Sequence, residues 1–374
     1  MKKTLRILCI AGMLLFLFVA CGGLFTTAQD PNAEAERTPP APDQTGDPDV
    51  IEIVTPTAPT EEPTPEITPE PTPAQTEPSD TPAPSEEAFC ANFPDYDTGV
   101  DADYSYQSDN LRIAITVHRE PLKDNRGRNL DEVYYVADIW VRNLYAFRTA
   151  FANGAFDKGS EEGDTLARRE NAILAVNGSY NQGLVLQYGT VLKKPRANKG
   201  WNSGAVGILY RDGSLKTFYL QKEKLDLNQE IENGAWVGWQ FGPIVIRDYA
   251  EGPGATSYHN MGFKARNILG YYEPGHYVIV TCDCRGDEAR GMNEYMIVDL
   301  MQSLGVKEAF NLDGGTSAVL VFMGEIINHP TLRNDNGTLV EGRPIVDMLV
   351  FGEYDENGNS PDLASLTAAK HPEN

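Results

Sequence analysis

The sequence predicts an α+β fold built on mixed or antiparallel sheets with a few helices, in a single domain of the size of a typical enzyme domain. Short runs of alternating or continuous apolar residues, which are typical of strands, recur between residues 111 and 351. Two of them, 206–210 and 215–220, flank Arg211-Asp212-Gly213-Ser214, a sequence that favours a tight hairpin turn. Long apolar segments with helical spacing are rare, and the clearest one spans residues 292–304.

The other expected strands follow from local patterns. Residues 111–117 and 133–139 alternate between apolar and polar side chains or stay apolar. The run 172–176 is continuously apolar and ends at Asn177-Gly178, as a buried strand does before a turn. Further strands are expected at 244–246, 277–281, 317–322 and 345–351.

The expected helix and the domain limits complete this outline. In residues 292–304, four apolar side chains share one helical face, and Gly305 directly after them is a good stop. Residues 91–355 contain no internal repeat and are numerous enough to bury the core of one domain. Residues 356–374 are expected to form a flexible tail.

The first 21 residues have the features of an export signal. A cationic start at Lys2, Lys3 and Arg6 is followed by an apolar run, which ends in Phe18-Val19-Ala20-Cys21-Gly22, as a bacterial lipobox does. The run is short for a membrane-spanning helix, which favours a cleaved lipoprotein signal over an uncleaved N-terminal anchor. Both alternatives place the rest of the chain outside the cytoplasm, and a lipidated Cys21 carrying several acyl chains would hold it on the cell membrane.

Residues 22–90 are predicted to be a disordered linker. Of the 25 prolines in the chain, 15 lie between Pro31 and Pro84, and residues 29–87 contain 15 carboxylates against one basic residue and no aromatic residue. Such a segment cannot bury a core. It supplies −14 of the net charge of −23, so the domain itself is only moderately acidic. This charge argues against nucleic acid as a partner.

The cysteines predict little structure. Cys9 would leave with the signal, so Cys90, Cys282 and Cys284 remain beside the lipidated cysteine. An oxidising location would allow a disulfide from Cys90 to Cys282 or Cys284. The Cys-x-Cys pair lacks companion ligands for zinc, and no Walker, Rossmann or nucleophile-elbow pattern is present. No cofactor is therefore expected, and a metal requirement is left open.

One segment stands out as a candidate site. The apolar run 309–312 ends in Asp313, and two glycines and two hydroxyl side chains follow at once. A carboxylate at the end of a buried strand is held on rigid backbone, and glycines allow a ligand to approach the main-chain N–H groups. Taken alone, the pattern fits equally well an ordinary turn supported by an Asp side chain.

Several motifs in order resemble the phosphodiester glycosidase family, in the form found in many bacterial surface proteins. The resemblance covers residues 104–352. The motifs are Asn177-Gly178-Ser179-Tyr180, Phe241-Gly242-Pro243, Ala265-Arg266-Asn267-Ile268-Leu269-Gly270, Asp283-Cys284-Arg285, Asn311-Leu312-Asp313-Gly314-Gly315, Asn328-His329-Pro330 and Gly342-Arg343-Pro344-Ile345-Val346-Asp347. The resemblance implies an α+β fold and hydrolysis of a sugar 1-phosphodiester.

That activity suits a site with one principal carboxylate. A phosphodiester is a weakly basic leaving group, so its bond to the anomeric carbon needs little proton donation. Asp313 is the first candidate, as nucleophile or as the base that activates water. Asp283 is the second catalytic candidate, although it could instead pair with Arg285 or cap its turn.

The resemblance also implies substrate contacts. Arg266 and Arg343 match the family's arginines and are candidate clamps for the phosphate, unless they form structural ion pairs. Asn177 is a candidate contact for sugar hydroxyls, or a residue that ends a strand. A clamp requires that both arginines, Asp313 and Asn177 line one pocket.

The residues after Asp313 complete the candidate set. Gly314 and Gly315 would offer N–H groups to an oxyanion or simply allow the turn. Thr316 and Ser317 are further candidate substrate contacts. His329, as a lone histidine, is interpreted as structural.

The chain departs from the family pattern at Ser179, Asn181 and the segment 316–318, and it lacks a usual Ser within 288–291. The substrate therefore cannot be transferred from the family. The favoured hypothesis is a surface-anchored hydrolase that cleaves the glycosidic bond of a sugar 1-phosphodiester in a wall polymer, exopolysaccharide or glycan. The alternative is a non-catalytic glycan-binding surface lipoprotein.

Overall fold

The computed structural model describes residues 89–97, 99–121, 131–197, 204–256, 262–284, 289–329, 332–333, 339–340 and 342–370. All of them belong to one compact unit, Glu77–Asn374. The predicted signal 1–21 with Cys21, the linker up to residue 88, and Arg285 lie outside the described residues. No helix within these ranges has both the length and the apolar character needed to cross a membrane.

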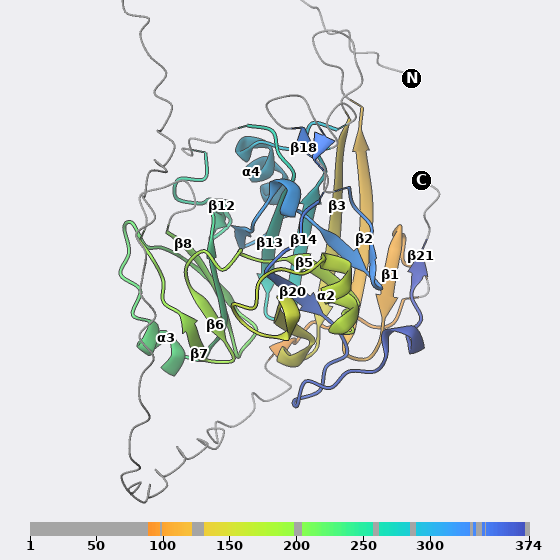
Figure 1. The fold of residues 1–374 in the computed structure, drawn as a ribbon, viewed down its shortest axis with the longest axis horizontal. Coiled ribbons are helices and arrows are strands. Elements are labelled where there is room, and N and C mark those ends of the chain that lie inside the picture. The colour runs from red at the N-terminus through yellow and green to blue at the C-terminus, as the bar shows by residue number, and fades with distance from the viewer. Residues whose placement is uncertain are drawn as a thin grey trace, which may run out of the picture. The chain divides into compact units, whose positions relative to one another are not determined.

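The largest element is a nine-stranded sheet in which every neighbouring pair is antiparallel (Figure 1). Its strands, in spatial order, are β12 (Ala250–Glu251), β11 (Ile244–Arg247), β15 (Glu308–Asn311), β13 (Arg266–Glu273), β14 (His276–Cys282), β3 (Glu132–Val141), β2 (Leu111–Glu120), β1 (Tyr104–Gln107) and β21 (Ala369–Lys370).

Two five-stranded antiparallel sheets and a hairpin are the other sheets in the part of the chain that the structure describes. The first sheet contains β7 (Thr190–Lys193), β6 (Val185–Gln187), β10 (Ala235–Phe241), β8 (Ala205–Tyr210) and β9 (Leu215–Tyr219). The second contains β17 (Glu325–Ile326), β16 (Leu320–Phe322), β5 (Leu174–Asn177), β20 (Asp347–Phe351) and β4 (Phe147–Phe151). The hairpin pairs β18 (Leu332–Arg333) with β19 (Leu339–Val340).

The described helices are few and short, which confirms the predicted α+β class. They are α2 (Gly163–Arg169), α3 (Leu227–Glu232), α4 (Glu294–Ser303) and the single 3₁₀ turns Leu144–Ala146, Ala152–Gly154, Gly315–Ser317 and Leu363–Ser365. The helix expected at 292–304 is α4, and the expected hairpin is β8–β9. The strand expected at 317–322 begins only at Leu320, because Gly315–Ser317 forms a 3₁₀ turn.

Helix α4 packs on the nine-stranded sheet. Its buried residues Ile297 and Met301 join a cluster with Val278 of β14. Gly270 of β13 lies beneath this contact, where an added Cβ would come within 2.6 Å of Val278 and 2.7 Å of Met301. A larger residue at this position would therefore push α4 away from the sheet.

The ends of the domain differ from the expectation. Phe89 is buried in the main core, so the domain begins before residue 91. Leu363 also joins this core, and β21 pairs with β1, with Lys370 opposite Tyr104. Residues 356–370 are thus part of the domain, not a flexible tail. Scattered apolar residues in a polar segment have no periodicity, which is why the sequence pattern misses them.

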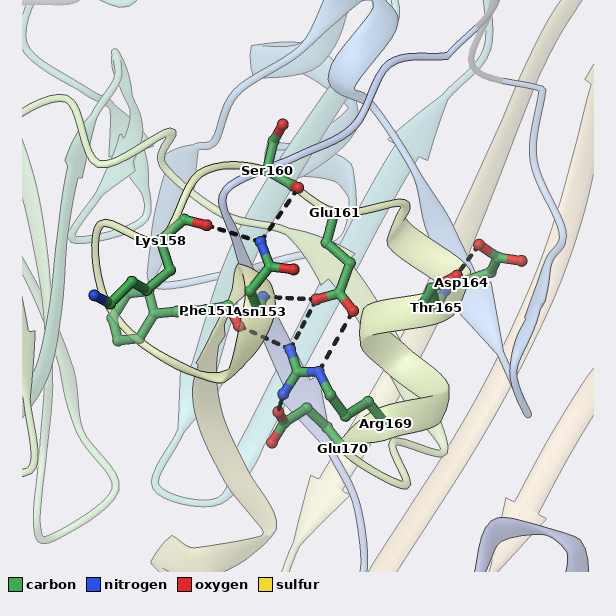
Figure 2. Close-up of polar contacts among 9 residues, drawn as sticks. All are labelled: Phe151, Asn153, Lys158, Ser160, Glu161, Asp164, Thr165, Arg169 and Glu170. Carbon is green, nitrogen blue, oxygen red and sulfur yellow. Dashed lines mark hydrogen bonds and ion pairs between the residues drawn. The ribbon is translucent and has the colours of Figure 1, made fainter.

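Polar contacts fasten the loop before α2 to the end of that helix (Figure 2). Arg169 pairs with Glu161 at 2.9 Å and donates a hydrogen bond to the Phe151 carbonyl at 2.8 Å. Glu161 also accepts the N–H of Asn153, whose backbone is left-handed, with φ of 55°. Burial alone would raise the pKa of Glu161, but the hydrogen bonds from Arg169 and Asn153 outweigh it and hold the pKa below its ordinary value.

We expect Glu161→Gln to lower the free energy of unfolding by about 1–2 kcal/mol at neutral pH, because Arg169 and Asn153 lose their charged acceptor. A carboxyl whose folded-state pKa is lowered stabilises the protein above its unfolded-state pKa, and this contribution disappears as the pH falls. Chemical denaturation should show that the difference in free energy of unfolding between variant and wild type is smaller at about pH 3 than at about pH 7.

The matched control is Glu170→Gln. Glu170 pairs with the same Arg169 from a more exposed position. We expect Glu170→Gln to lower the free energy of unfolding by less than about 0.5 kcal/mol. Equal losses in the two variants would contradict this account of the loop.

Candidate active site

A cavity of about 270 Å³ lies where the ends of several elements meet. These are the end of β10 with the following cis Gly242-Pro243 bond, the starts of β13 and α4, and the turn after β15. The lining residues are Phe241, Gly242, Pro243, Lys264, Ala265, Arg266, Glu294, Asn311, Asp313, Gly314, Gly315, Thr316 and Arg343.

The backbone around Asp313 is held from two sides. Its N–H donates to the Gly178 carbonyl at 3.0 Å, and its own carbonyl accepts the Asn177 side-chain amide at 2.9 Å. On the other side, Gly315 donates its N–H to the Ala265 carbonyl at 2.8 Å and has φ of +65°. The Asp313 carboxylate is therefore fixed on rigid backbone, as its place after a buried strand predicts.

The two glycines serve the turn. An added Cβ on Gly314 would lie 2.7 Å from the Ala265 carbonyl oxygen, so only glycine allows this close approach. The N–H of Gly314 donates to Asp313 Oδ1 at 2.9 Å, and that of Gly315 donates to Ala265. Both donors are used within the protein, which favours the turn-forming alternative over an oxyanion-binding one.

The Asp313 carboxylate is largely buried, with 13% of its side chain exposed. Burial raises the pKa of Asp313 above its ordinary value, against the opposing effects of a hydrogen bond from Ser317 and the charge of Arg343. The carboxylate is thus a stronger base than a solvated aspartate, and it lies next to a cation.

Arg343 is an accessible cation in the cavity lining. Its Nη2 lies 3.2 Å from Asp313 Oδ2, and its Nε donates to the hydroxyl of the buried Ser317 at 2.7 Å. Its guanidinium also lies over the ring of Tyr180, 4.9 Å from the ring centre. With 45% of its side chain exposed, Arg343 can still donate to a ligand.

Arg266 lines the same cavity but is already engaged. Its Nη2 pairs with Glu294 at 2.7 Å and also donates to the Gly262 carbonyl at 3.2 Å. Its Nε donates to the Met292 carbonyl at 3.1 Å. The structure therefore brings both predicted arginines and Asp313 to one cavity, while it ties Arg266 into a buried ion pair.

Asn177 does not line the cavity. It is buried, and its side-chain oxygen accepts hydrogen bonds from the Val319 N–H at 3.0 Å and from the Asn267 side chain. Together with its bond to the Asp313 carbonyl, these contacts join β5 to the Asp313 turn. The expectation that Asn177 shares the pocket is wrong, because the side chain points into the backbone scaffold behind Asp313.

Asp283 is fully buried and also lies outside the cavity lining. Its carboxylate accepts the Asn328 side-chain amide at 3.1 Å and the His329 N–H at 2.8 Å. Asn328 in turn bonds Leu320 and Ala318, just beyond the glycine turn. Asp283 therefore braces the chain after the site, and the structure does not place this second catalytic candidate beside Asp313.

The cysteines of the domain are buried. Cys90 and Cys282 carry free thiols, so the disulfide from Cys90 that an oxidising location would allow is not formed. Burial raises the pKa of Cys282 to about 12. Within the described ranges, His, Cys, Asp and Glu side chains nowhere form a group of three or more that could hold a metal ion.

Three charged groups at or behind the cavity escaped the sequence prediction. Lys264 and Glu294 line it, and burial together with the charge of Arg266 lowers the pKa of Lys264. Asp347 lies behind it and accepts the N–H groups of Ser179 and Tyr180 at 2.8 and 2.9 Å. Only the position of Asp347 at the end of a family motif pointed to it in the sequence.

The Asp347 carboxyl predicts a pH effect on stability. Burial, opposed by the hydrogen bonds from Ser179 and Tyr180 and reinforced by the charge of Asp313, raises its pKa from 3.8 to about 6. A raised pKa means that the folded state binds the proton more tightly, so stability is lost as the pH rises through this window. Relative to Asp347→Asn, the wild type should lose on the order of 2–3 kcal/mol between about pH 4 and about pH 6.

Denaturant titrations of both proteins across that range measure the difference in slope. Asp347→Asn also lowers the free energy of unfolding by removing the carboxylate that accepts the Ser179 and Tyr180 N–H groups. This loss is the same at every pH, so it does not change the slope. Parallel stability curves would show that Asp347 does not titrate in this window.

Comparison with known proteins agrees with the fold and the motifs. Residues 163–352, half of the chain, match the sequence profile of the phosphodiester glycosidase family. Human N-acetylglucosamine-1-phosphodiester alpha-N-acetylglucosaminidase is 30% identical over 182 residues, which cover 44% of this chain and 35% of the human protein. An SPbeta prophage-derived uncharacterized protein of Bacillus subtilis is 26% identical over 206 residues, covering 52% and 30% of the two chains.

A solved structure shares the fold. The zebrafish N-acetylglucosamine-1-phosphodiester alpha-N-acetylglucosaminidase catalytic domain, auto-inhibited by its pro-peptide, has a TM-score of 0.50 and 19% identity, over 67% of this chain and 86% of that one. The chain spans about a third of the length of the curated relatives it matches. On its profile match, its ordered motifs and its fold, the chain belongs to the phosphodiester glycosidase family.

Proposed function

We propose that this protein hydrolyses the glycosidic bond of a sugar 1-phosphodiester, with Asp313 reacting at the anomeric carbon and Arg343 binding the phosphate. The observation that carries the proposal is the pairing of these two side chains, 3.2 Å apart, in one cavity. The similarity to human N-acetylglucosamine-1-phosphodiester alpha-N-acetylglucosaminidase supports the class of reaction.

The chemistry follows from the charges. The bond between the anomeric carbon and the phosphate oxygen breaks, and its electron pair leaves with the phosphate. The Arg343 guanidinium can meet two phosphate oxygens at once as this charge develops. Asp313 either attacks the anomeric carbon or takes a proton from the attacking water, and its raised pKa suits both roles.

The partners of Arg343 in the structure explain how the cation is presented. Nε donates to Ser317, the Tyr180 ring lies beneath the guanidinium, and Nη2 donates to Asp313 at 3.2 Å. A phosphate that enters the cavity competes with Asp313 for these donors. Its binding would free the carboxylate for reaction.

Location is part of the proposal. A lipidated Cys21 would anchor the chain on the outer side of the cell membrane. The linker, which ends before the buried Phe89, would then separate the domain from it by on the order of 150 Å or more if extended. Substrates in a wall polymer, an exopolysaccharide or a surface glycan lie within that reach.

The test is turnover by the full-length protein on a panel of sugar 1-phosphodiesters, with and without chelator. We expect release of reducing sugar together with a phosphomonoester. Binding of glycans without turnover across the panel would contradict the proposal and favour a non-catalytic glycan-binding lipoprotein.

A further inference from the structure

A second carboxylate in the cavity has an unused oxygen. Glu294, the first residue of α4, lines the same cavity as Asp313 and is 4% exposed. Its Oε1 pairs with Arg266 at 2.7 Å. Its Oε2 is buried and has no hydrogen-bond partner among the described residues.

A buried carboxylate oxygen without a donor is unusual, because folded proteins almost always satisfy such atoms. The helix does not require Glu294 as a cap. Asn293 fills that role, since its side chain accepts the Met296 N–H at 3.0 Å. The unpaired oxygen is therefore not explained by the local structure of α4.

The ion pair with Arg266 restricts what Glu294 can do. Its Oε1 accepts the hydrogen bond from Arg266, and its Oε2, as a carboxylate oxygen, offers an acceptor and no donor. The group that completes it must carry an O–H or N–H donor, which sugars provide through their hydroxyl and acetamido groups.

The position of Glu294 places this carboxylate in the wall of the cavity that Asp313 also lines. Arg266, its partner, directly follows Ala265, whose carbonyl accepts the Gly315 N–H at 2.8 Å. Glu294 and the turn that follows Asp313 therefore both contact the start of β13. A sugar that reaches Asp313 therefore occupies the same cavity of about 270 Å³ whose wall Glu294 helps to form.

We propose that Glu294 Oε2 accepts a hydrogen bond from a hydroxyl or acetamido group of the sugar whose anomeric bond is cleaved, and so selects that sugar. Arg266 is then a positioning residue that acts through Glu294. The inference rests on the proposed function and deepens it: the substrate class is a sugar 1-phosphodiester with a donor group at one specific ring position, in contact with Glu294.

The test compares wild type and Glu294→Gln in the full-length protein on a sugar 1-phosphodiester and its monodeoxy analogues. For one ring position, removal of the donor should lower kcat/KM of the wild type by about ten- to a hundredfold. Glu294→Gln should lower kcat/KM of the parent sugar by a similar factor and leave that deoxy analogue nearly unchanged. An equal loss on every substrate, or no loss at all, would overturn the proposal.

Glu308→Gln is the matched control. Glu308 is a buried carboxylate on β15 whose oxygens are both bonded, to the Thr217 hydroxyl at 2.6 Å and the Asp248 N–H at 3.2 Å, and it lines a different cavity. We expect it to leave the ratio between parent and deoxy substrates unchanged. Thermal unfolding of both variants shows whether the fold is kept.

Binding separates this inference from the proposed function. Titration of glucose 1-phosphate, N-acetylglucosamine 1-phosphate and the monodeoxy glucose 1-phosphates by calorimetry needs no turnover. Selective binding that is lost in Glu294→Gln supports the role of Glu294 even if no phosphodiester is hydrolysed. Turnover with equal affinity for all analogues in both proteins would overturn the role of Glu294 and leave the proposed function intact.

Discussion

Replacing Asp313 with Asn is expected to lower kcat on a sugar 1-phosphodiester by about a thousandfold or more and to leave the fold unchanged. Asn keeps the size of the side chain and can still accept the Gly314 N–H, but it cannot attack the anomeric carbon or take a proton from water. Initial rates of sugar release measure the loss, and thermal unfolding checks the fold.

Asp226→Asn is the control for this change. Asp226 caps α3, and Asn caps helices equally well, so activity and stability should both stay close to wild type. Undiminished turnover by Asp313→Asn would remove Asp313 from the mechanism. In the wild type, activity should fall as the pH drops through the raised pKa of Asp313, because the protonated carboxyl is neither a nucleophile nor a base.

Replacing Arg343 with Gln is expected to lower kcat/KM by about a hundredfold on phosphodiester substrates. Gln cannot neutralise the charge that develops on the leaving phosphate. Arg343→Lys should recover only part of the loss, because an ammonium cannot contact Ser317, Asp313 and the phosphate from one planar group.

A substrate without phosphate isolates this role. An aryl glycoside of the same sugar should lose much less activity in Arg343→Gln than the phosphodiester does. Arg142→Gln is a suitable control, since Arg142 is exposed and stacks on Phe93, away from the cavity lining. Equal losses on both substrate types would show that Arg343 does not act on phosphate.

Elements with a strong local signal could be predicted from the sequence. Helix α4 has apolar residues at helical spacing and a clean stop, and β8–β9 surround a tight turn. Strand β13 was missed because Arg266 and Asn267 are polar and Gly270 interrupts the pattern. These residues are explained only by tertiary structure, since Gly270 makes room for α4 and Arg266 pairs across to it.

In the candidate site, too, some residues could be predicted from the sequence, and others are explained only by tertiary structure. Asp313 and Arg343 stood out because each follows or precedes a strand within a motif, and both line the cavity. Asn177 and Asp283 belong to equally clear motifs, yet they are buried behind the site as hydrogen-bonding scaffold. Glu294 looked like an ordinary acidic residue in the first turn of a helix, and only the fold brings it to the cavity that Asp313 lines.

Hydrolysis in ¹⁸O-labelled water tests the central claim most directly, because it shows which bond is broken. If the protein is a glycosidase in which Asp313 acts at the anomeric carbon, mass spectrometry will find the label on the released sugar and none on the phosphomonoester. Label on the phosphate would mean cleavage of a phosphorus–oxygen bond, and it would contradict the account of Asp313 given above.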